Sequence, residues 1–123
     1  MLPEKLLEII KYEGVVAIVT QGDIEPHVVN TWNSYIKITE EDKILIPVGN
    51  MNVTEKNIEK NNNIQLTLGS REVQGKIGPG TGFLIKGTAS LAKDGVAYDT
   101  IKNSFPWARA ALEVKVNSAV QTL

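Results

Sequence analysis

Six consecutive residues, 30–35, combine side chains that proteins use to bind a flat polar molecule. The run reads Asn-Thr-Trp-Asn-Ser-Tyr and follows Pro-His-Val-Val, so the pattern predicts a strand around it. Successive strand residues point to opposite faces, and each face would here mix amide or hydroxyl groups with one large ring. An ordinary half-buried strand separates its apolar face from its polar face. Two interpretations follow: a wall that stacks on and hydrogen-bonds to a flat ligand, or a core strand whose rings fill the interior.

A second candidate is the loop at residues 49–54, which reads Gly-Asn-Met-Asn-Val-Thr. It leads from a predicted strand into a predicted helix, and the free N–H groups and dipole of a helix N-terminus suit a phosphate. The alternative is an ordinary strand-to-helix connection in which Thr54 caps the helix.

Residues 78–82, Gly-Pro-Gly-Thr-Gly, have the spacing of a nucleotide-binding loop in the wrong context. That fingerprint follows a strand and opens a helix, whereas this run opens an apolar strand at Phe83. Its glycines therefore indicate positive φ or the close approach of another backbone or a ligand.

The segment 105–109, Phe-Pro-Trp-Ala-Arg, is the last candidate. Trp107 could cover a ligand ring and Arg109 could reach an anion. Arginine is scarce, because Arg71 and Arg109 are the only two in the chain. The alternative is a hydrophobic plug between a helix and a strand, with Arg109 on the surface.

The chain has no cysteine and a single histidine, His27. The missing thiols exclude a disulfide, a thiolate nucleophile and iron–sulfur ligation. One histidine cannot supply the ligands of a usual zinc site, and no motif around His27 indicates a catalytic triad. No metal site or catalytic residue is therefore predicted, and difficult chemistry would depend on a bound organic cofactor.

Length and charge limit the class of protein further. A chain of 123 residues with 42% hydrophobic content predicts a single domain, 1–123. The 13 basic and 14 acidic residues give a net charge of −1 without a basic stripe, which argues against nucleic-acid binding. No apolar run approaches the roughly 20 residues of a membrane span. We therefore expect a cytoplasmic protein without a membrane partner.

The pattern predicts a mainly β fold. Helices are expected at 3–12, 54–61 and 95–103, and strands at 15–20, 27–38, 43–48, 64–70, 83–91 and 110–116. Residues 27–48 would form a hairpin, 71–82 would be irregular, and a polar tail would follow 116. About six strands without regular strand–helix–strand units indicate an antiparallel sheet that closes into a small β-barrel with short helices.

Seven segments, in order along nearly the whole chain, give it a family resemblance. They are Glu-Gly-Val-Val-Ala-Ile (13–18), Val-Asn-Thr-Trp-Asn-Ser-Tyr (29–35), Pro-Val-Gly-x-Met (47–51), Thr-Leu-Gly-Ser-Arg (67–71), Gly-Pro-Gly-Thr-Gly-Phe-Leu-Ile (78–85), Trp-Ala-Arg-Ala-Ala-Leu (107–112) and Gln-Thr-Leu (121–123). With these segments the chain resembles the small FMN-binding proteins of the pyridoxamine-phosphate-oxidase-like split-barrel group.

The resemblance implies an antiparallel split-barrel homodimer that binds FMN non-covalently at each subunit interface. Trp32 and Tyr35 would lie near the isoalloxazine, Trp107 would cover another side, and Leu123 would reach the partner subunit's flavin. The full set of implied cofactor-binding residues is Asn30, Thr31, Trp32, Asn33, Ser34, Tyr35, Gly49, Asn50, Met51, Asn52, Thr54, Trp107 and Leu123.

One position departs from the family pattern. A lysine normally precedes the threonine of the phosphate loop, and here that position is Val53. An apolar side chain cannot neutralise a phosphate. Our hypothesis is that Asn52, Thr54, Ser34 and the helix N-terminus hold the phosphate through neutral hydrogen bonds.

Three functions are consistent with a bound flavin. The first is a redox protein that passes electrons between other proteins. The second is an FMN-dependent oxidoreductase, either a flavin reductase that uses a nicotinamide donor or an oxidase of a small substrate. The third is an FMN reservoir or sensor. Pyridoxamine-phosphate oxidation is disfavoured, because its phosphorylated substrate needs cationic anchors and only two arginines exist.

Overall fold

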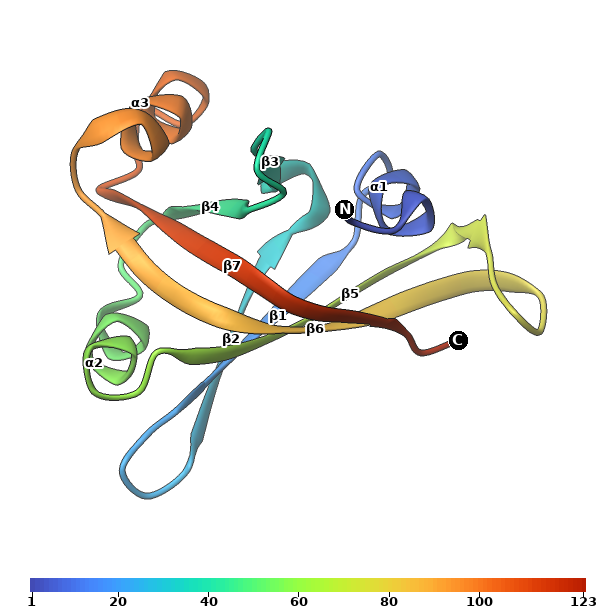
Figure 1. Cartoon of the computed structure of the whole chain (residues 1–123), viewed down its shortest axis with the longest axis horizontal. Helices are drawn as coiled ribbons and strands as arrows, with labels where there is room; N and C mark the ends of the chain where they lie inside the picture. Colours follow the sequence, from blue (N-terminus) through green and yellow to red (C-terminus); the bar gives the residue numbers. More distant parts are fainter.

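One seven-stranded antiparallel sheet with three short α-helices around it forms the computed structural model, which describes residues 1–123 (Figure 1). In pairing order the strands are β2 (Pro26–Trp32), β1 (Val15–Gln21), β5 (Asn63–Gln74), β6 (Pro79–Ala92), β7 (Ala110–Gln121), β4 (Ile44–Val48) and β3 (Lys37–Ile38). The helices are α1 (Glu4–Ile9), α2 (Asn52–Lys60) and α3 (Gly95–Ser104), and a 3-10 helix spans Asn33–Tyr35. The predicted mainly β, antiparallel fold is confirmed.

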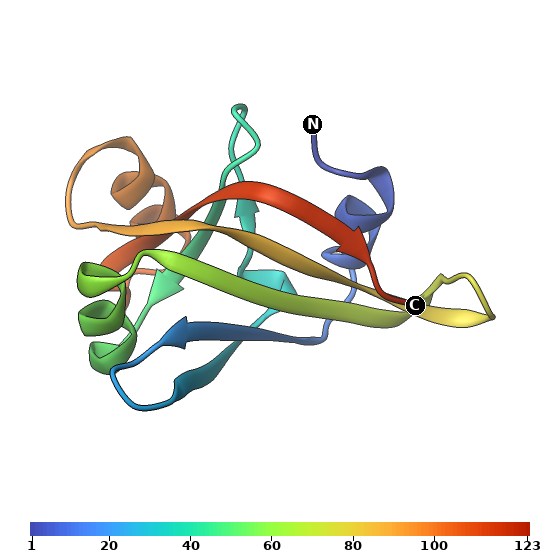
Figure 2. The same cartoon turned by 60° about the horizontal axis from the view of Figure 1, so that its bottom comes forward.

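The long strands β5, β6 and β7 form a curved layer, and the β1–β2 hairpin turns beneath it in the view of Figure 2. Because side chains alternate across a strand, one face of each strand enters the core. The main core joins inward-facing residues of β1, β4, β5, β6 and β7 to Leu6 and Ile9 of α1 and Ile58 of α2. Burying each large aliphatic side chain contributes about 1.5–3 kcal/mol. A smaller cluster beneath α3 contains Leu45, Ile101, Ala108 and Ala111.

The predicted strand at 27–38 and the hairpin at 27–48 are wrong. The strand ends at Trp32, the 3-10 helix follows, and only Lys37–Ile38 pairs with β4. β2 pairs with β1 instead. The break occurs at Asn33, whose buried Nδ2 donates to the carbonyl oxygens of Tyr12 at 2.9 Å and Gly69 at 3.1 Å. These hydrogen bonds to distant parts of the chain hold the segment in a turned conformation in place of continued strand pairing.

The region 71–82 is more regular than predicted. β5 continues to Gln74 and β6 begins at Pro79, with a register shift between Ser70 and Gln74. The glycines there behave as predicted: Gly80 has φ +104°, and a Cβ on Gly82 would lie 2.9 Å from the Leu68 oxygen. β7 also runs five residues beyond 116, to Gln121, because it pairs with β6 as far as Phe83.

The three predicted helices are all present, with their ends moved by a few residues. The predicted capping role of Thr54 is wrong. α2 begins at Asn52, and the capping position is Met51, whose side chain accepts no helix N–H. None of the helices is long and apolar enough to cross a membrane. The cytoplasmic location stays a prediction.

Candidate functional site

A pocket lined by aromatic rings lies where β2, the 3-10 helix, the end of β4 and the segment after α3 meet. Its volume is about 140 Å³. The lining residues are Asn30, Thr31, Trp32, Tyr35, Pro47, Gly49, Met51 and Trp107. All of these except Pro47 belong to the predicted set, so residues far apart in the sequence are brought together here. Pro47 belongs to the family segment 47–51 but was not predicted as a site residue.

Three rings form a cluster at one side of this aromatic pocket. The centroid of Tyr35 lies 5.0 Å from that of Phe105 and 5.9 Å from that of Trp107, and Phe105 and Trp107 are 5.8 Å apart. Trp32 and Trp107 remain 40% and 54% exposed. Large exposed rings gathered at one place are typical of a binding surface.

The loop between β4 and α2 has a strained backbone. Asn50 and Met51 follow each other in the left-handed region, with φ of 52° and 57°. Such residues cost about 1–3 kcal/mol each and cluster at ligand sites. Gly49, just before them, would place a Cβ 3.0 Å from Cζ3 of Trp107, so its lack of a side chain lets the indole lie over the loop. Asparagine tolerates this conformation, but nothing in the sequence indicates it for Met51.

The first turn of α2 offers hydrogen-bond donors without partners. The N–H groups of Asn52, Val53 and Thr54 donate to no group of the protein. Thr54 is 1% exposed, and its Oγ1 has no hydrogen-bond partner. A buried hydroxyl left in this state costs about 1–3 kcal/mol, so it indicates a missing acceptor. The donors and the positive end of the helix dipole suit an anion, whereas the half-exposed Val53 adds no charge.

Arg109 does not point freely into solvent. Its Nε and Nη2 donate to the Asn50 oxygen at 2.9 and 2.7 Å, and Nη2 lies 2.9 Å from Oε1 of Glu55. Lys93 binds the other oxygen of Glu55 at 2.8 Å. The hydrogen bonds from Lys93 and Arg109 lower the pKa of Glu55 below its usual value. From the sequence we predicted that Arg109 could reach an anion, and nothing in the sequence indicated this network.

Several predicted site residues lie outside the lining of the aromatic pocket. Asn33 is buried in the contacts described above, and Asn50 and Asn52 are exposed on the strained loop and at the start of α2. Ser34 binds Glu13: its Oγ donates to Oε2 at 2.7 Å and its N–H to Oε1 at 3.1 Å. These two bonds lower the pKa of Glu13.

Leu123 follows the end of β7 and lies outside the aromatic pocket. Its main-chain oxygen accepts from Thr81 Oγ1 at 3.0 Å, Gln121 Nε2 at 3.1 Å and the N–H of Lys76 at 3.1 Å. Leu123 borders a shallow groove together with Glu13 and Gly14, and it is 51% exposed. Within one chain, therefore, Leu123 does not join the aromatic pocket.

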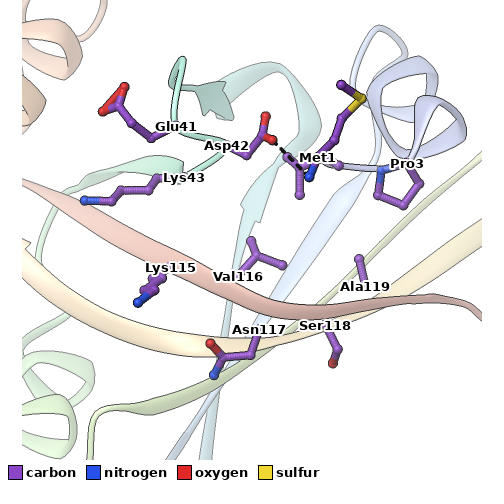
Figure 3. Close-up of a pocket in the computed structure, with 11 residues that line it drawn as sticks. Met1, Pro3, Glu41, Asp42, Lys43, Lys115, Val116, Asn117, Ser118 and Ala119 are labelled. Carbon is purple, nitrogen blue, oxygen red and sulfur yellow. Dashed lines mark ion pairs between the residues drawn. The ribbon is translucent and has the colours of Figure 1, made fainter.

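A larger hollow of about 550 Å³ lies at the N-terminus (Figure 3). Met1 and Pro3 face residues 41–43 and 115–119 across it, and the terminal amine lies 3.4 Å from Oδ2 of Asp42. It contains no aromatic ring and none of the predicted site residues. We therefore place the candidate site at the smaller aromatic pocket, where rings, a strained loop and unpartnered donors coincide.

The fold and this arrangement of residues define a family. The family model described as pyridoxamine 5'-phosphate oxidase matches residues 2–121, and the chain belongs to that family. Over all 123 residues it is 53% identical to the FMN-binding protein of Nitratidesulfovibrio vulgaris strain Miyazaki F, covering 100% of both chains. The resemblance drawn from the seven segments is thereby confirmed.

Solved structures agree with the split-barrel fold. HupZ of Group A Streptococcus aligns with a TM-score of 0.80 and 17% identity, covering 98% of this chain and 94% of its own. An FMN-binding protein of Syntrophomonas wolfei subsp. wolfei aligns with a TM-score of 0.72 and 15% identity, covering 98% of this chain and 85% of its own. At such identities the likeness concerns the fold alone.

Proposed function

We propose that this chain binds FMN non-covalently at the aromatic pocket and serves as a small electron-transfer protein. The observation that carries the proposal is the adjacency of two surfaces. The rings of Trp32, Tyr35 and Trp107 lie at the pocket, and the loop that lines it leads directly to the unpartnered donors of α2. FMN has the two matching parts, a flat ring system and a phosphate. The name of the relative that is 53% identical, an FMN-binding protein, supports the assignment.

Neutral donors would hold the phosphate, because Val53 has no charge. We assign this role to the Thr54 hydroxyl, the N–H groups at the start of α2 and the exposed amide of Asn52. Ser34, included in the hypothesis from sequence, already donates its hydroxyl to Glu13, so we assign it no phosphate contact. Compared with a site that has a lysine at position 53, the absent ion pair should lower FMN affinity by about tenfold to a hundredfold, or about 1–3 kcal/mol.

When bound, FMN supplies one- and two-electron redox chemistry, and the protein supplies orientation and surroundings. The exposed edges of Trp32 and Trp107 leave the pocket open to the surface, where a partner protein can approach. This exposure favours the electron carrier, which has to meet a partner protein, over the oxidoreductase and the reservoir.

A second copy of the chain would complete the site in a homodimer. The pocket of one chain is smaller than the about 300–1,000 Å³ typical of ligand sites, so one chain covers FMN only in part. Strand register places one outward-facing row across five strands: Asn30, Ala17, Thr67, Leu84 and Val120. Val15 and Val28, at 52% and 61% exposed, flank this row. The row begins at Asn30 on the pocket rim, so a partner packed on it would adjoin the flavin.

Titration of the flavin-free protein with FMN and with riboflavin tests the proposal. We expect binding of both, with FMN several-fold tighter, and loss of that preference in Thr54→Val. A wild-type protein that takes up neither flavin refutes the function. Equal affinities for the two ligands would refute the phosphate site but not flavin binding itself.

Rapid-mixing reduction of the FMN-loaded protein separates the three roles. Slow reduction by NADH and NADPH, together with reversible reduction at an electrode or by a redox protein, is expected for a carrier. Fast reduction by a nicotinamide, without any partner, would instead identify an oxidoreductase. If neither nicotinamides nor redox proteins reduce the bound FMN, the reservoir or sensor is the remaining function.

A further inference from the structure

The turn that precedes α2 needs an external restraint. Asn50 and Met51 are both left-handed, a conformation that asparagine tolerates but that is strained for Met51. Such strain persists only where the surrounding structure over-determines it. Their conformation sets the direction in which the chain enters α2. It therefore also sets where the free N–H groups of residues 52–54 lie.

Arg109 spans this turn. Within the turn, its guanidinium donates twice to the Asn50 oxygen. Beyond the turn, it binds the Glu55 carboxylate in the first turn of α2. The residues with unpartnered donors lie between these two attachment points. Bonds from a guanidinium are charge-assisted and directional, so the two on Asn50 hold its peptide in one orientation.

Arg109 is itself held in a rigid frame. Its N–H donates to the Val48 oxygen at 2.9 Å, beside the last rung of the β4–β7 ladder, where Val48 pairs with Ala110. Lys93 binds Glu55 from the other side at 2.8 Å. Arg109, Lys93 and Glu55 together carry a net charge of +1. This charge lies close to the donors of α2, where Val53 itself is uncharged.

We propose that Arg109 is the positioning residue of the anion-binding turn: its fork joins the Asn50 oxygen to Glu55 and keeps the N–H groups of residues 52–54 arranged for a phosphate. The proposal rests on the proposed FMN function. It differs from a general structural role, because it predicts a selective loss of affinity for the phosphate-bearing ligand.

The experiment compares Arg109→Gln and Arg109→Lys with the wild type. FMN and riboflavin affinities are measured by calorimetry, and amide hydrogen exchange of the flavin-free proteins is followed over residues 50–55. Lys60→Gln is the matched control, because it removes one cation from the far end of α2, where Lys60 pairs with the exposed Asp23.

We expect Arg109→Gln to weaken FMN binding several-fold, enough to remove most of its preference over riboflavin, while riboflavin binding stays close to the wild-type value. Exchange over residues 50–55 should quicken, and Lys60→Gln should leave both quantities unchanged. Arg109→Lys keeps the charge but not the fork, so it should restore only a minor part of the preference.

The proposal is overturned if Arg109→Gln keeps the same ratio of FMN to riboflavin affinity as the wild type. It is also overturned if amide exchange over residues 50–55 does not change. Full rescue by Arg109→Lys also overturns it, because charge alone would then suffice. If Arg109→Gln does not fold, Glu55→Gln takes its place, since it loosens the same fork from the other side. A wild-type protein that binds no flavin refutes the function, and the exchange data then decide whether Arg109 orders the turn.

Discussion

The side-chain amide of Asn33 donates to the main-chain oxygen of Tyr12 across 2.9 Å, where β2 gives way to the 3-10 helix. The same nitrogen reaches the Gly69 oxygen, so one buried group ties the segment after α1 to β5. We expect Asn33→Leu to lower the free energy of unfolding by about 1–3 kcal/mol, because buried carbonyl oxygens lose their donor. Asn33→Asp should cost more, since its carboxylate would face those oxygens. Chemical denaturation measures both, and unchanged midpoints would contradict the assignment.

Gly49→Ala should disturb the flavin site without unfolding the protein. The new methyl would lie 3.0 Å from Cζ3 of Trp107, so the indole must move by a few tenths of an ångström. We expect FMN affinity, measured by calorimetry, to fall several-fold. Gly78→Ala is the control, because nothing lies within 4 Å of a Cβ there. Equal affinities in the two variants would show that the glycine is not needed for the placement of Trp107.

The contact between Glu13 and Ser34 should depend on pH. Ser34 binds the charged carboxylate and lowers the pKa of Glu13 below its usual 4.5. Its contribution to stability is therefore present above about pH 4.5 and is lost as the pH falls through the lowered folded-state pKa. We expect Ser34→Ala to lower Tm at pH 7, with the gap to the wild type closing as the pH falls below the lowered pKa of Glu13. A gap that is constant across this range would contradict the ionic character of the contact.

Val53→Lys should supply the cation that the phosphate loop lacks. Val53 is 51% exposed in the first turn of α2, so a lysine there fits without repacking the core. FMN should bind about tenfold to a hundredfold more tightly, while riboflavin binding stays unchanged. Val96→Lys, on the exposed face of α3, controls for net charge. A parallel gain for both ligands would indicate a general effect of charge rather than a phosphate contact.

Val120→Asp should weaken the proposed dimer. Val120 is 57% exposed and continues the outward row on β7, so a carboxylate there would be buried without a partner in the assembly. Light scattering coupled to size exclusion should find a dimer for the wild type and a larger monomer fraction for the variant. Ile77 is 88% exposed in the turn between β5 and β6, so Ile77→Asp should leave the mass unchanged. A wild-type monomer at all concentrations would refute the dimer.

Regular patterns in the sequence predicted most of the fold. The alternation at Val16 and Ile18 and the apolar run of β4 contribute to the core, and both strands lie where they were expected. The exception is residues 30–35, where apolar and polar types do not alternate cleanly. There the buried amide of Asn33, which acts on oxygens far away in the chain, overrides the local preference for a strand.

The aromatic pocket was predicted in outline, because Trp32, Tyr35 and Trp107 are conspicuous and the family order ties them together. The roles of the polar residues were harder to predict. Ser34 gives no sign in the sequence that Glu13 will engage it, and Arg109 gives none that it will bind a main-chain oxygen. Both contacts depend on backbone positions that tertiary packing sets.

The chain has only two tryptophans, and both line the aromatic pocket. Every indole in the molecule therefore borders the space assigned to the flavin, and no other indole contributes background. The protein thus contains its own optical probe, whose emission reports occupancy of the site without any attached label. The single variants Trp32→Phe and Trp107→Phe would show how much of the change in emission comes from each indole.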